Sequence, residues 1–282
     1  MCRMLGFRSV INSQVHSSLM SAENSLVHQS NIHPDGWGVA YYMAGAPHII
    51  KSDISAFKDS LFSKVSGIVS SQTVIAHIRK ATEGEVNILN THPFQFGRWV
   101  FAHNGHVRNF NINRPKLLKL IDGELSRFIL GTTDSEILFF IILSFIKRTN
   151  SLESEVSYSV IKDSVSEAIQ EICKIIGPFC ASDVCGEEAK SENFLSFLIT
   201  DGKMMLAHQG GKPLYYSTYK KRCPERDTCK SFATACESMA NEDEGVMHFL
   251  ISSEPLQGHN VWNLIPPTHI IGVDKNLKLK IK

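Results

Sequence analysis

The chain has 282 residues, of which 43% are hydrophobic and 20% charged, and its formal net charge is +1. This length is enough for one large domain or two modest ones with a packed core. The balanced charge provides neither a basic field for nucleic acid nor an acidic tail for a charged partner, so we expect neither. The longest apolar run, residues 137–146, is about half a membrane span, and the first residues lack the apolar segment of a secretory signal.

Cysteine usage indicates a reducing compartment. The seven cysteines are odd in number and contain no Cys-x-x-Cys pair. Without a secretory signal, this favours reduced thiols in the cytoplasm over a disulfide framework. We therefore expect a cytoplasmic protein whose later cysteines are buried or loop thiols, namely Cys173, Cys180, Cys185, Cys223, Cys229 and Cys236.

The first half of the chain predicts short strands with two helices between them. β-type composition and turn residues predict strands over residues 1–10, 37–42, 48–51, 73–78 and 98–103. Helices are expected over residues 17–29 and 54–64. The dipeptide Asn104-Gly105 is a strong hairpin-turn signal and is expected to break the last of these strands.

Two longer helices are expected in the middle of the chain. Thr133 and the polar residues up to Glu136 predict a helix start before the apolar run 137–146. A second helix is expected over residues 152–176, where Gly177-Pro178 ends it.

The second half is rich in strands. They are expected over residues 194–200, 203–208, 214–219, 247–252, 270–273 and 277–281. The polar stretches Ala181–Glu192 and Lys220–Gly245 are expected to be surface insertions or mobile loops. Sheets packed on each other with helices outside fit this order. A doubly wound parallel sheet would need a helix between most strands, which the pattern does not offer.

Cys2 is the first residue with a chemical signature. If Met1 is removed, one residue carries both a thiol and a free α-amine, whose reference pKa is about 7.7–8.0. That amine could accept the thiol proton, as in N-terminal nucleophiles. A stray thiol at a frayed end is the alternative from position alone.

Further polar motifs follow Cys2 in a fixed order. They are Asp35-Gly36-Trp37-Gly38-Val39, His77-Ile78-Arg79-Lys80-Ala81-Thr82, Asn90-Thr91-His92-Pro93-Phe94, His103-Asn104-Gly105, Thr133-Asp134-Ser135-Glu136 and Ser253-Glu254-Pro255-Leu256, then Trp262 and Ile265-Pro266. In this order and behind a penultimate cysteine, they resemble the type-2 glutamine amidotransferases, which are N-terminal nucleophile hydrolases. The last motifs resemble the small single-domain branch that includes γ-glutamyl hydrolases of ergothioneine and glutathione metabolism.

The resemblance implies a role for each matching position. Cys2 would be the nucleophile, and the Asn104 side chain and Gly105 N–H would stabilise the oxyanion. Arg79 offers a planar fork for a substrate carboxylate, and Thr82 a hydroxyl. Asp134 would face the substrate ammonium, because burying that charge without a partner would be costly.

Simpler interpretations of the same residues remain open at this stage. Arg79 and Asp134 could form a structural ion pair, Asn104-Gly105 could be only a turn, and Asp35-Gly36 favours a turn near the nucleophile. The scattered histidines match no compact ligand spacing, so we expect no metal and no cofactor. Lys80 and Glu83 stand where many relatives carry an aromatic residue and a histidine. The sequence therefore does not define the chemistry of the group that accepts the γ-glutamyl group or the ammonia.

We therefore predict one α+β domain over residues 1–282, a four-layer αββα sandwich of two mainly antiparallel sheets. The predicted activity is thiol-dependent hydrolysis of a γ-glutamyl amide, by default glutamine to glutamate and ammonia. One alternative is a stand-alone hydrolase of a γ-glutamyl peptide or conjugate, and another is a silent amino-acid sensor. An ammonia-accepting partner protein and a homo-oligomer are both compatible with the sequence.

Overall fold

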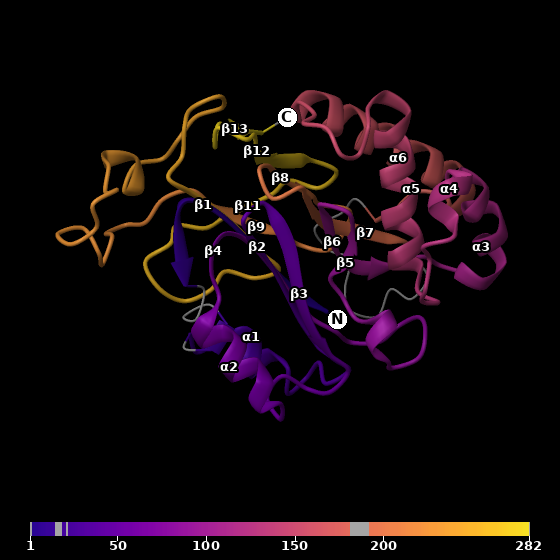
Figure 1. Cartoon of the computed structure of the whole chain (residues 1–282), viewed down its shortest axis with the longest axis horizontal. Coiled ribbons are helices and arrows are strands. Elements are labelled where there is room, and N and C mark those ends of the chain that lie inside the picture. The colour runs from indigo at the N-terminus through magenta and orange to yellow at the C-terminus, as the bar shows by residue number, and fades with distance from the viewer. Residues whose placement is uncertain (1, 15–18, 21, 181–191, 282) are drawn as a thin grey trace.

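The structure is a computed structural model, and it describes residues 2–14, 19–20, 22–180 and 192–281. Two antiparallel sheets lie at its centre (Figure 1). In spatial order, the seven-stranded sheet contains β11 (Asn263–Leu264), β9 (Tyr215–Ser217), β10 (His248–Ser252), β1 (Arg3–Gln14), β4 (Ser70–Ile78), β2 (Trp37–Met43) and β3 (Ala46–Ser52). The six-stranded sheet contains β13 (Leu279–Lys280), β12 (Ile270–Val273), β8 (Met205–His208), β7 (Phe194–Thr200), β6 (Trp99–His106) and β5 (Phe94–Phe96).

Helices cover the outer faces of both sheets. The helices α1 (Leu26–Gln29) and α2 (Ser60–Ile68) lie on the side of the seven-stranded sheet. The other side carries α3 (Phe110–Leu117), α4 (Gly123–Ser126), α5 (Asp134–Thr149) and α6 (Tyr158–Ile176) (Figure 1). The predicted αββα architecture is confirmed.

The alternating direction of the side chains along β1 shows how the sequence specifies the layers. Met4 belongs to the cluster between the two sheets, whereas Leu5 and Phe7 belong to the cluster under α1 and α2. A Cβ at Gly6 would lie 2.9 Å from the Met205 sulfur, so the smallest residue stands where the sheets meet. Successive side chains of a strand point to opposite faces, and both faces of β1 are covered here.

Thr133 begins α5 as predicted. Its hydroxyl accepts the Glu136 N–H at 3.3 Å, and the buried carboxylates Asp134 and Glu136 lie in the first turn. Negative charge is favourable at this end of a helix. The N-terminus of α5 thereby fixes one acidic candidate residue in place.

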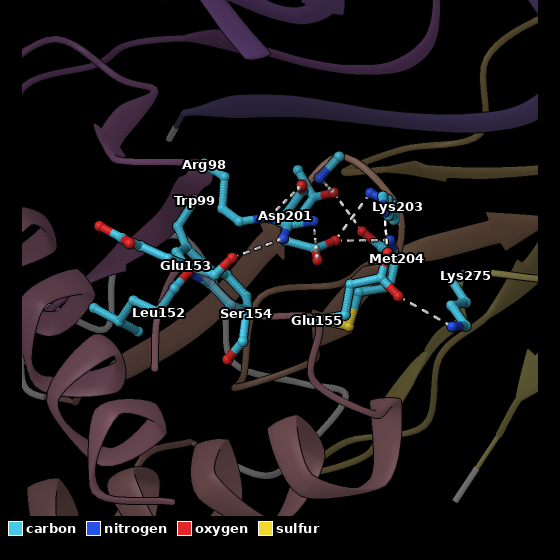
Figure 2. A network of polar contacts seen from close by, with 12 residues as sticks. Arg98, Trp99, Leu152, Glu153, Ser154, Glu155, Asp201, Lys203, Met204 and Lys275 are labelled. Atoms are coloured by element: carbon cyan, nitrogen blue, oxygen red, sulfur yellow. Dashed lines mark hydrogen bonds and ion pairs between the residues drawn. The ribbon is translucent and has the colours of Figure 1, made fainter. Parts of the chain in front are cut away.

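The helix expected over residues 152–176 starts later, at Tyr158. Ser157 caps it by accepting the Val160 N–H at 3.4 Å. The preceding loop is tied to the strands instead: the Trp99 indole donates to Leu152 O at 3.0 Å, and Glu155 pairs with Lys203 and Lys275 (Figure 2). An available serine cap and these anchors outweigh the helical composition of residues 152–156.

Two other expectations are wrong in part. Of the helix expected over residues 17–29, the described residues confirm helical structure at residues 19–20, which are π-helical, and over Leu26–Gln29, whereas residues 22–25 are not helical. Residues 15–18 and 21 lie outside the described ranges. The dipeptide Asn104-Gly105 does not break its strand. Strand β6 continues to His106, because β7 pairs with it without a break from the Val100–Thr200 pair to the His106–Phe194 pair.

Of the two polar insertions, only Lys220–Gly245 lies wholly within the described residues. Most of Ala181–Glu192 lies outside the described residues. The insertion Lys220–Gly245 projects from the sheets, in orange in Figure 1, and the Lys220 N–H donates to Cys236 O at 2.9 Å. It is a surface insertion with its own internal bonding.

The cysteines correct one expectation. Cys180 is disulfide-bonded rather than a free thiol. Cys2, Cys173, Cys223, Cys229 and Cys236 are free. Among the described residues, we find no helix with the length and apolar character needed to cross a membrane.

Candidate active site

The candidate site forms where β1 begins and β4 ends. Arg3 pairs with Ile78 in antiparallel register, which places Cys2 beside Arg79 and Lys80. The Cys2 sulfur accepts the Lys80 N–H at 3.2 Å and approaches Lys80 O at 3.3 Å. Cys2 is only 9% exposed, so the thiol is held by the backbone of the neighbouring strand end.

Opposing effects act on the Cys2 thiol. Burial raises its pKa, while the hydrogen bond from Lys80 and the charge of Arg79 oppose that rise and Asp134 adds to it. The raised pKa keeps the resting thiol protonated near neutral pH. A reaction at this sulfur therefore needs a base that removes the proton.

Arg79 lies under a loop formed by the residues that follow it. Its guanidinium donates to the carbonyls of Glu83, Gly84 and Glu85 at 3.1, 3.3 and 3.1 Å, and the residue is 2% exposed. Burial lowers its pKa, and the opposing charges are Cys2, Asp35 and Asp134. A guanidinium carries more N–H groups than three bonds use, so capacity for a carboxylate remains.

Asp134 is bound through backbone amides. Its carboxylate accepts the N–H groups of Val107 and Ser135, both at 2.7 Å, and the residue is 2% exposed. Asp134 and Arg79 do not form an ion pair in the described part of the chain, so the simple structural pairing is not what the structure contains. Both charged residues nevertheless act electrostatically on the Cys2 thiol, Arg79 lowering its pKa and Asp134 raising it.

Asn104 and Gly105 reach the site from the second sheet. The Asn104 side-chain nitrogen donates to Ser253 Oγ at 3.4 Å, and the same oxygen accepts the Met4 N–H at 3.0 Å. A Cβ at Gly105 would lie 2.0 Å from Phe194 O, so close strand approach requires glycine there. The pair is therefore part of a strand that approaches the strand of Cys2, not a hairpin.

Thr82 stands apart from the buried group. It is exposed and lies in the loop over the Arg79 guanidinium. The expected turn at Asp35-Gly36 supports this loop, because the Ala81 N–H donates to an Asp35 carboxylate oxygen at 2.8 Å and Gly36 has φ +122°. Of the site residues expected from sequence, Thr82 alone is not enclosed with the others.

A layer of buried histidines lies behind the site. The rings of His77 and His92 stack at 4.2 Å, and burial lowers the pKa of His77 to about 3. The His103 ring contacts Ser135 Oγ and Phe194 O, both at 2.9 Å. In the described ranges, no group of three or more ligating side chains could hold a metal ion.

Sequence reasoning gave Ser253 no separate role. The structure places its hydroxyl between the strand of Cys2 and the Asn104 amide. The motif Ser253-Glu254 contributes to the sequence prediction only through the resemblance, because a serine after a strand indicates no function by itself.

Comparison with known proteins identifies the family of the chain. Residues 1–276 match the family model of class-II glutamine amidotransferases. A putative glutamine amidotransferase of Haemophilus influenzae is 29% identical over 74% of this chain and 63% of its own length. A probable glutamine amidotransferase of Saccharomyces cerevisiae is 25% identical over 98% of this chain and 82% of its own.

Two further comparisons concern the resemblance to γ-glutamyl hydrolases and the fold. A γ-glutamyl-hercynylcysteine sulfoxide hydrolase of Mycobacterium tuberculosis is 35% identical over 26% of this chain and 32% of its own length. The crystal structure of a predicted glutamine amidotransferase from Pseudomonas aeruginosa shares the fold with a TM-score of 0.59, at 23% identity and full coverage of both chains. Because residues 1–276 of its 282 match the family model, the chain belongs to the class-II glutamine amidotransferases, a family of enzymes.

Proposed function

We propose that the chain hydrolyses the γ-amide of glutamine, or of a γ-glutamyl conjugate, through a γ-glutamyl thioester on Cys2. The observation that carries the proposal is the strand register that places Cys2 beside Arg79, with the Asp134 carboxylate at the start of α5 acting electrostatically on the same thiol. The Asn104 amide adjoins this group through Ser253.

The charged residues suit an amino acid head group. Arg79 would bind the α-carboxylate with the N–H groups that the loop carbonyls leave available, and Asp134 would bind the α-ammonium. Thr82 would add a hydroxyl from the loop above Arg79. Both charges of the substrate would then be paired, as a buried site requires.

The nucleophile needs a base because burial raises the pKa of the Cys2 thiol. After Met1 is removed, the α-amine of Cys2 would take the thiol proton through a water molecule. Its reference pKa of about 7.7–8.0 suits proton transfer near neutral pH.

The reaction can then be written with every atom placed. The sulfur attacks the γ-amide carbon, and the oxyanion is stabilised by the Asn104 side-chain N–H and the Gly105 backbone N–H. The ammonium of Cys2 gives its proton to the amide nitrogen, the C–N bond breaks and ammonia leaves a thioester. The amine then takes a proton from water as its oxygen attacks the thioester carbon. The C–S bond breaks, the ammonium of Cys2 returns that proton to the sulfur, and glutamate leaves with the thiol restored.

A second candidate function differs from the first in the group that leaves the γ-glutamyl carbon. The similarity to the mycobacterial hydrolase supports a stand-alone hydrolase of a γ-glutamyl peptide or conjugate. A glutaminase subunit would instead pass ammonia to a partner protein. Residues 1–282 would act as one cytoplasmic domain in either case.

A substrate screen with a matched variant tests the proposal. Glutamate release is measured from glutamine, glutathione and other γ-glutamyl conjugates, with wild type and with Cys2→Ala. We expect release from at least one compound by wild type and none by Cys2→Ala. Binding of glutamine without release by wild type would instead support the sensor alternative.

A further inference from the structure

We propose that Ser253 is a positioning residue that orients the Asn104 side-chain amide toward the reacting carbonyl, an inference that rests on the function proposed above. Ser253 directly follows β10, the neighbour of β1 in the sheet. Its N–H donates to Met4 O at 3.1 Å, and its Oγ accepts the Met4 N–H at 3.0 Å. The hydroxyl is thus fixed to the nucleophile's strand, two residues from Cys2.

The same oxygen is the acceptor for Asn104. Its side-chain nitrogen donates to Ser253 Oγ at 3.4 Å, and Asn104 is 4% exposed. A hydroxyl has two acceptor lone pairs, so it can accept from Met4 and Asn104 together. The Asn104 amide has two N–H groups, and this contact uses one and leaves the other for an oxyanion.

Without that anchor, the amide would lose its defined orientation. The terminal torsion of asparagine is broad and roughly two-fold, so the amide nitrogen and oxygen can exchange places. The exchanged orientation would present an oxygen acceptor to a developing negative charge. Ser253 therefore links the geometry of two elements that belong to different sheets.

The next residue reinforces the position of Ser253. The Glu254 carboxylate accepts the Gln29 side-chain N–H at 2.7 Å and lies 3.5 Å from the Arg3 guanidinium nitrogen. The peptide after Ser253 is consequently tied to α1 and to β1. These contacts stabilise the backbone, and the hydroxyl alone reaches Asn104.

Kinetics of four variants separate positioning from general structural support. Ser252 is the matched control, because it is the adjacent serine, is buried, and its Oγ accepts the Glu254 N–H at 3.5 Å instead of contacting Asn104. Glutamate release is measured for Ser253→Ala, Ser252→Ala, Asn104→Ala and the Ser253→Ala/Asn104→Ala double variant, on the compound that wild type hydrolyses fastest. A misplaced catalytic group can cost about 10²-fold in rate.

We expect Ser253→Ala to lower kcat by about 10- to 100-fold with KM within about twofold, and Ser252→Ala to leave both unchanged. In the Asn104→Ala background, Ser253→Ala should cause no further loss. Independent, multiplicative losses would overturn the proposal, as would an equal loss in Ser252→Ala. If Ser253→Ala does not fold, Ser253→Thr and Ser253→Val form the test pair, and only the threonine should retain kcat.

A spectroscopic measurement tests the contact without using turnover. In protein labelled with ¹⁵N-asparagine, the Asn104 side-chain NH₂ signals are assigned by their loss in Asn104→Ala. We expect Ser253→Ala to shift this pair and reduce the separation of its two protons, while Ser252→Ala leaves it in place. Unmoved signals in Ser253→Ala would overturn the proposal. If Ser253→Ala shifts the signals but wild type releases no glutamate from any compound, only the proposed function is refuted.

Discussion

Arg79 shows how one residue can support both the fold and the proposed chemistry. It holds three carbonyls of the loop over the site, and burial together with nearby negative groups defines its charge environment. The sequence predicted the residue and its carboxylate-binding role through the resemblance. It could not predict the loop carbonyls, because a guanidinium's backbone partners depend on how residues 83–85 fold back.

Arg79→Lys tests this residue. A lysine keeps the charge but loses the planar fork, so we expect KM for the γ-glutamyl substrate to rise by about 10- to 100-fold, corresponding to the loss of one or two charge-assisted hydrogen bonds. Steady-state kinetics and the affinity for L-glutamate report the change. Unchanged values of both would assign Arg79 a purely structural role.

Asp134→Asn tests recognition of the ammonium. The variant keeps an acceptor for the Val107 N–H but loses the charge. Wild type should hydrolyse glutamine much better than the analogue that lacks the α-amino group, since only glutamine carries the charge that Asp134 pairs. We expect Asp134→Asn to reduce that preference at least tenfold, measured as the ratio of kcat/KM values. A preserved ratio would remove Asp134 from the proposed ammonium site.

Strand β6 illustrates where element-level prediction succeeds and where it fails. Its β-type composition predicted a strand correctly, but the local turn preference of Asn104-Gly105 suggested an end that does not occur. The partner strand β7 lies about ninety residues further along the chain, and its pairing outweighs a two-residue preference. The start of α5 was predictable because Thr133 caps it locally.

Gly105→Ala tests the close strand approach. Its Cβ would lie 2.0 Å from Phe194 O, so β6 and β7 must separate locally. We expect a loss of about 1–3 kcal/mol in the free energy of unfolding, measured by urea denaturation. Gly67→Ala in α2 is the control, because nothing lies within 4 Å of its Cβ, and it should be neutral or stabilising by up to about 1 kcal/mol. Equal effects of the two substitutions would contradict the strand assignment.

At the scale of the whole molecule, three buried clusters separate four layers, and the histidines lie within this packed interior. Strand composition and helix placement in the sequence were sufficient to predict the layers. The histidine stacking was not predictable, because His77 and His92 come from segments whose register is set by the complete sheets. The disulfide at Cys180 was likewise missed, since counting cysteines describes a compartment rather than an individual pair.

The buried histidines are expected to make the folding stability of the protein sensitive to acid. Burial lowers the pKa of His77 and His33 to about 3 and that of His208 and His248 to about 4, below the model-peptide value of 6.5. Between pH 6.5 and 4 the unfolded chain therefore binds more protons than the folded one, so stability falls as pH falls. Glu136, whose pKa is raised by burial, acts in the opposite direction.

Urea unfolding at a series of pH values checks whether stability falls as the pH falls. We expect the free energy of unfolding to be flat from pH 8 to 7 and to decline by several kcal/mol from pH 6.5 to 4.5. Most surface carboxylates with lowered pKa titrate below that window, so histidines dominate it. A stability that is constant or rising toward pH 4.5 would contradict the buried neutral state of these rings.

The acid-quenched intact mass of the protein during turnover tests the central claim most directly. The account predicts a population that lacks Met1 and carries one additional γ-glutamyl group, which peptide mapping places on the N-terminal peptide at Cys2. Cys2→Ala should show no adduct, and the free thiols Cys173, Cys223, Cys229 and Cys236 serve as internal controls. An adduct on one of those thiols, or full turnover by protein that retains Met1, would contradict the account.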